Sequence, residues 1–203
     1  MLPDDKTVKK LFEFICEKTR EPNIKKGCAA DESAHHYLDV SLCAEKIAMH
    51  CGLDSHKAKI LGLFHDYGEY IERTEPNTFH GTAGYDEMMK MGYDEIARVC
   101  LTHSFWEGVY APEYFVYDKK EVARARELIS KMELDEYDYL IQLSDMLCCH
   151  RKFVKLEERV DYIIKKYKRN PEQAEKMIRA AKKLKSRFDN LCKQDVYELL
   201  EIK

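Results

Sequence analysis

Apolar residues recur at helical spacing along almost the whole chain, and this periodicity limits the fold more than any other feature of the sequence. The first apolar stripe includes Leu11 and Ile15 and ends before Pro22. Gly52 and Gly92 mark the ends of later helices. No segment shows the alternation of polar and apolar residues that predicts a β-strand. We therefore expect an all-α protein, built as a helical bundle.

Capping residues locate the starts of several helices. Asp54 or Ser55 caps a helix that carries "KAKILGLFHD", and Asp118 with Glu121 resembles a capping box. The predicted helices cover residues 5–20, 32–51, 55–66, 81–91, 94–104, 119–131 and 136–149. A loop is predicted over 71–79. A helical arm is predicted over 153–203 at the C-terminus, and the segment "RNPEQ" divides it into two helices.

Length and charge narrow the classes of protein. A chain of 203 residues suits one domain with one core, so we expect a single domain over 1–203. The 34 basic and 37 acidic residues nearly balance, which argues against binding to duplex nucleic acid. The charged C-terminal helical region contains "KKYKRNPEQAEKMIRAAKKLKSR", and we interpret it as a solvated arm in preference to an anion-binding patch. No apolar run is long enough to span a membrane.

The cysteines indicate a cytoplasmic location. The chain has 8 of them, none in a CxxC pair, and its first residues, "MLPDDKTVKK", contain no apolar signal segment. We therefore expect free and mostly buried thiols in a reducing compartment.

The segment "LFHDYGEY" places an imidazole and a carboxylate, His65 and Asp66, at the end of an apolar helix. Burial of an ionisable group without a partner costs roughly several kcal/mol of free energy, so the fold has to supply partners for both side chains. Adjacent residues on a helix point about 100° apart. If the partners are metal ions, His65 can therefore bind one ion from the side while Asp66 lies between two ions.

Other ionisable side chains also interrupt apolar helical stripes. Each of them alone is explained by a hydrogen bond or a helix cap, but together they exceed what a small core can satisfy separately. One shared metal site would neutralise the whole set, which is His36, His65, Asp66, His80, His103 and Asp145. The set offers nitrogen and oxygen only, which suits Fe, Mn, Co, Ni or catalytic Zn. Six ligands suit two divalent ions with a carboxylate between them.

This H…HD…H…H…D pattern resembles the HD-domain superfamily of metal-dependent phosphohydrolases. The resemblance rests on "AHHYLDVSLCAEKIAMHCGLDSHKAKILGLFHDYGEY" and "LIQLSDML", and it covers an HD core of about residues 32–150. It implies that His36, His65, Asp66 and Asp145 are the core ligands. It also implies that His80 and His103 are the additional pair of two-metal members.

The resemblance implies cleavage of a phosphate ester of a nucleotide or related small molecule by metal-activated hydroxide. Asp66 and Asp145 are the expected catalytic carboxylates. Two alternatives remain open at the level of the sequence. Similar HD-type proteins with two irons are oxygenases that cleave C–C or C–P bonds, and a non-catalytic HD module is the third reading.

The substrate contacts are less well defined. Glu69 stands where many members of the superfamily have a lysine that helps to hold a phosphate. Candidate contacts are Lys59, Trp106 and Arg151. For the two cations the alternative is a role in surface solubility, and the aromatic loop that contains Trp106 would either stack on a base or pack on the core.

Overall fold

The computed structural model describes residues 1–20, 30–75, 77–105, 119–168 and 171–203. It confirms the all-α prediction, and in the described part of the chain no helix is long and apolar enough to cross a membrane. The elements are α1 (Asp5–Thr19), α2 (Ala30–Cys51), α3 (Ser55–Phe64), α4 (Glu69–Thr74), α5 (His80–Lys90), α6 (Asp94–Thr102), α7 (Lys119–Ser130), α8 (Glu136–Met146), β1 (Cys148–Cys149), β2 (Lys152–Phe153), α9 (Leu156–Tyr167), α10 (Pro171–Cys192) and α11 (Val196–Leu199).

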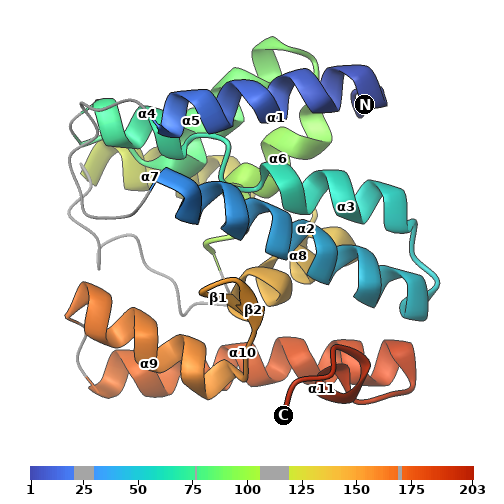
Figure 1. The fold of residues 1–203 in the computed structure, drawn as a ribbon. Helices are drawn as coiled ribbons and strands as arrows, with labels where there is room; N and C mark the ends of the chain where they lie inside the picture. The colour runs from blue at the N-terminus through green and yellow to red at the C-terminus, as the bar shows by residue number, and fades with distance from the viewer. Residues whose placement is uncertain (21–29, 76, 106–118, 169–170) are drawn as a thin grey trace.

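Helices α2 and α8 lie in the middle of the bundle, with α1 on one side and α9 and α10 on the opposite side (Figure 1). The helix pair α2 and α3 turns back on itself at Gly52, whose φ is 72°. The two helices approach so closely that a Cβ on Gly62 would lie 2.9 Å from Val40 O. This packing brings the first half of α2 next to the C-terminal end of α3, where the His-Asp pair follows.

A second close approach places α5 beside the His-Asp pair. A Cβ on Gly68 would lie 2.1 Å from His80 O and 2.5 Å from Gly84 N, so only glycine fits there. The prediction of a loop over 71–79 was wrong in its first part, because α4 continues to Thr74. This helix has no fully buried residue, and a single turn of mixed polarity gives no clear apolar stripe.

The predicted helix over 136–149 was wrong at its end, because α8 stops at Met146 and a short antiparallel hairpin follows. His150 and Arg151 form its turn, both with positive φ (51° and 63°), which is the backbone conformation of tight hairpin turns. Strands of two residues are too short to show alternation, so the sequence could not reveal them.

The C-terminal arm is docked on the bundle and only its outer face is solvated. One face of α9 and α10 belongs to the same buried core as α2, α3 and α8. This face consists of Leu156, Val160, Met177, Ala180, Ala181, Leu184 and Phe188. The arm therefore contributes to the interior of the protein as well as to its charged surface.

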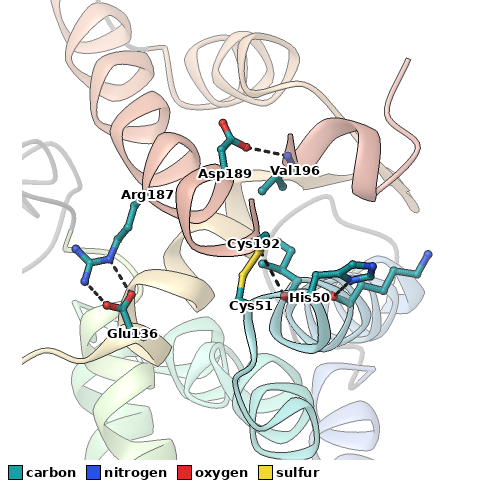
Figure 2. The surroundings of a disulfide bond; sticks show 9 residues. His50, Cys51, Glu136, Arg187, Asp189, Cys192 and Val196 are labelled. Carbon is teal, nitrogen blue, oxygen red and sulfur yellow. Dashed lines mark hydrogen bonds and ion pairs between the residues drawn. A yellow bond between two sulfur atoms is a disulfide. The ribbon is translucent and has the colours of Figure 1, made fainter. Parts of the chain in front are cut away.

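A disulfide joins Cys51, at the end of α2, to Cys192, at the end of α10 (Figure 2). The expectation that all the cysteines are free was wrong for this pair. The two residues are 141 positions apart, and their Cα atoms lie 4.2 Å from each other only because α10 packs on α2. The free cysteines of the described ranges are all buried, as expected, and they are Cys16, Cys43, Cys100, Cys148 and Cys149. Cys28 lies outside the described residues.

Candidate metal centre

Asp66 directs its two carboxylate oxygens to two different groups of histidines. On one side, Oδ1 lies 3.1 Å from Nε2 of His103 and 3.5 Å from Nε2 of His80. The two imidazole nitrogens are 3.2 Å apart. His80 begins α5 and His103 directly follows α6, so the packing of these two helices creates the group.

On the other side, Asp66 Oδ2 lies 3.3 Å from Nε2 of His65 and 4.0 Å from Nε2 of His36. Asp145, near the end of α8, completes this group, because its Oδ1 lies 3.0 Å from His36 Nε2. His36, and not its neighbour His35, belongs to the cluster.

Hydrogen bonds fix the orientation of the imidazole rings. The Nδ1–H of His65 donates to Gly62 O at 2.8 Å, and that of His103 donates to Val99 O at 3.0 Å. These bonds place the proton on Nδ1 and leave Nε2 as the free ligand atom, which is the usual arrangement around a bound metal. Nε2 of His65 is buried and has no hydrogen-bond partner among the described residues. A buried ring nitrogen without a partner is costly unless a ligand takes it.

The donor atoms fit two divalent ions. Ligand atoms at about 2.0–2.2 Å from a common ion lie about 3–4 Å from one another, by simple geometry from those bond lengths. The distances of 3.1, 3.2 and 3.5 Å in the first group and of 3.3 and 4.0 Å in the second fall in this range. Asp66 belongs to both groups. The nitrogen and oxygen donors suit the ions expected from the sequence.

Both carboxyl groups of the cluster are held in the ionised form. Burial acts to raise the pKa of Asp66, but the adjacent His65 and His103 outweigh it and keep that pKa well below its usual range. Burial also acts to raise the pKa of Asp145, and Arg159 and His36 reverse the effect and lower it strongly. The cluster therefore offers two anionic ligands at neutral pH.

Three side chains at the cluster were not identified from the sequence. Arg159, in the first part of α9, donates from Nη2 to Asp145 Oδ1 at 2.9 Å. Glu72 on α4 contacts Nδ1 of His80, and the hydroxyl of Ser104 lies 2.9 Å from His103 Nε2. Ser104 was detectable, because it directly follows a candidate ligand. The other two are recognisable only once the helices are packed.

The carboxylate of Glu69 pairs with residues outside the set of candidate ligands. Tyr37 and Arg73 both donate short hydrogen bonds to its carboxylate. Arg73 also donates to Ser33 Oγ at 2.6 Å. The guanidinium therefore balances the charge of Glu69 one helical turn away.

The candidate substrate contacts are not brought to the cluster. Lys59 is exposed and pairs with Glu45, nine residues along α2 from His36. Arg151 is exposed in the hairpin turn. Trp106 and most of its aromatic loop lie outside the described residues.

A family model described as HD domain matches residues 33–192. The match runs from α2 to the last residue of α10 and includes all six candidate ligands as well as Arg159. No match was found among curated proteins or among solved structures.

Proposed function

The chain belongs to the HD-domain family, and on that premise we propose that it is a metal-dependent phosphohydrolase. Its substrate would be a phosphate ester of a nucleotide or related small molecule. The observation that supports this function best is the position of Asp66, whose two oxygens face two separate groups of imidazole nitrogens. A bridging carboxylate between two divalent ions is an arrangement that suits phosphoryl transfer.

Each group of donors would hold one ion. His80 and His103 would bind the first, His36, His65 and Asp145 would bind the second, and Asp66 would bind both. When bound, the ions lower the pKa of water and neutralise the charge of phosphoryl oxygens.

The protein's own groups then orient the reaction. The hydrogen bonds of His65 and His103 to backbone carbonyls keep their Nε2 atoms directed inward. The Ser104 hydroxyl lies within reach of both imidazoles of the first group, at 2.9 and 3.5 Å from their Nε2 atoms, and can donate to a phosphoryl oxygen there. The strongly lowered pKa of Asp145 suits a permanent ligand better than a proton acceptor.

The proposal is tested on one preparation in two ways. Bound metal is counted per chain, and a panel of phosphate esters is then assayed with Mn²⁺ or Fe²⁺, with and without O₂. We expect up to two ions per chain and release of phosphate without O₂. Consumption of O₂ with an organic substrate would favour the HD-type diiron oxygenase instead. Less than one bound ion together with no turnover would leave a non-catalytic HD module.

A further inference from the structure

Arg159 is a partly buried cation that directly contacts the candidate metal centre. Its side chain is 14% exposed, and Nη2 donates to Asp145 Oδ1 at 2.9 Å. The same oxygen lies 3.0 Å from Nε2 of His36. A single carboxylate oxygen therefore separates the guanidinium from a candidate metal-ligand nitrogen.

The hydrogen-bonding capacity of this guanidinium is not used up by the protein. The Nε atom of Arg159 is buried and has no hydrogen-bond partner among the described residues. The ring of Tyr162 lies 5.7 Å from the centre of the guanidinium and offers no hydrogen-bond acceptor in its plane. An unsatisfied buried N–H of a charged group is costly. This N–H therefore remains available to a further hydrogen-bond acceptor, such as an anion.

The other cations discussed above are held elsewhere. Arg73 pairs with Glu69 and Ser33, and Lys59 pairs with Glu45 on the surface. Among the cations named here from the described residues, Arg159 is the one that pairs with the candidate ligand Asp145.

Resting on the proposed function, we propose that Arg159 binds the phosphate group of the substrate and is its specificity-determining cation. Guanidinium offers five N–H donors in a planar fork that matches phosphate oxygens. One of these donors holds Asp145, another faces the Cys149 sulfur, and the others remain for the phosphate. The C-terminal arm, which carries Arg159 on α9, is then a part of the substrate site.

A role limited to orienting Asp145 makes a different prediction. Loss of a residue that orients a metal ligand weakens metal binding by about 10- to 100-fold. Loss of a phosphate-binding cation leaves the ions in place, or strengthens their binding because a like charge is removed, and weakens the binding of phosphate. Metal affinity and phosphate affinity therefore separate the two roles.

The experiment measures the binding of inorganic phosphate to the metal-loaded protein by calorimetry, together with metal content per chain. Arg159→Met should weaken phosphate binding by at least about 10-fold, as expected for a lost charge-assisted hydrogen bond, with two ions retained. Arg159→Lys should keep both ions and still bind phosphate more weakly than the wild type, because an ammonium lacks the fork. Arg187→Met is the matched control, since Arg187 ties α10 to Glu136 on α8 (Figure 2) and should leave phosphate binding unchanged.

Each outcome decides the proposal. Wild-type affinity for phosphate in both variants overturns it and leaves the proposed function intact. A second outcome is that Arg159→Met loses metal while Arg159→Lys binds both metal and phosphate like the wild type. This outcome shows that Arg159 only orients Asp145, and it also overturns the proposal. A metal-loaded wild type that binds no phosphate contradicts the proposed function itself. If Arg159→Met does not fold by circular dichroism, the lysine variant decides alone.

Discussion

The Nδ1 atom of His80 lies 2.5 Å from Oε2 of Glu72, while its Nε2 faces Asp66. Burial alone would lower the pKa of His80, but the carboxylate of Glu72 raises it to about 9. In the metal-free protein the imidazole is therefore a cation at neutral pH. An ion that binds at Nε2 has to displace this proton, so metal binding and proton release are coupled.

The first prediction concerns stability against pH in the presence of a chelator. Because the pKa of His80 rises from 6.5 in the unfolded chain to about 9 in the folded one, its contribution is complete below pH 6.5 and is lost as the pH rises through 9. The loss amounts to about 3 kcal/mol at most. Urea unfolding at pH 6 and pH 9.5 measures it. Cysteine thiols of the unfolded chain titrate near the same range, so the comparison with Glu72→Gln isolates the pair. Equal losses in both proteins would contradict the assignment.

The second prediction concerns metal stoichiometry. Asp66→Ala should remove both ions, because each group of histidines uses one of its oxygens. His80→Ala should remove only one ion and leave the group around His65. Mass spectrometry of metal content after dialysis distinguishes the two. His56→Ala changes an exposed histidine and should have no effect. Two ions in Asp66→Ala would show that the carboxylate is not a shared ligand.

The third prediction concerns the backbone contact behind the His-Asp pair. In Gly68→Ala the new methyl group would meet the carbonyl oxygen of His80 at 2.1 Å, and backbone atoms cannot turn aside as a flexible side chain does. We expect the free energy of unfolding to fall by about 3 kcal/mol and the affinity for one ion to fall with it. Gly52→Asn is the control, because a Cβ there meets nothing within 4 Å and asparagine tolerates its positive φ. Equal stability of the two variants would rule out the close approach.

The fourth prediction concerns the disulfide between Cys51 and Cys192. A crosslink that closes a loop of 141 residues restricts the unfolded chain by about 5 kcal/mol in the entropic treatment. Addition of dithiothreitol should lower the midpoint of urea unfolding accordingly, and a variant with Cys51→Ser and Cys192→Ser should not respond to it. Thiol counting under non-reducing conditions provides the direct check. Finding both thiols free would refute the bond.

Much of the candidate centre is readable in the sequence, because its members break apolar stripes. His103 shares a stripe with Val99, and in the structure it is buried with Nδ1 bonded to that residue's carbonyl. His36 lies on α2 and His65 directly follows α3, and these helices are connected at Gly52, so the proximity of the two histidines follows from helix packing. The ligand set itself stays a prediction until metal is measured.

Other features depend on tertiary contacts that a sequence pattern does not contain. Arg159 lies in the amphipathic and highly charged segment "LEERVDYIIKKY", where arginine is expected to face solvent. Only the docking of α9 brings it to Asp145. The pairing of Cys51 with Cys192 likewise depends on α10 reaching the end of α2, and no spacing rule relates residues so far apart.

The same disulfide makes the segment from Cys51 to Cys192 a covalent ring. Five of the six candidate ligands and Arg159 belong to this ring, and His36 lies on the helix that leads into it. A single proteolytic cut anywhere between the two cysteines would therefore leave both fragments attached. The cleaved chain would keep all of its candidate ligands in one covalent molecule, and its fragments would separate only after reduction of the disulfide.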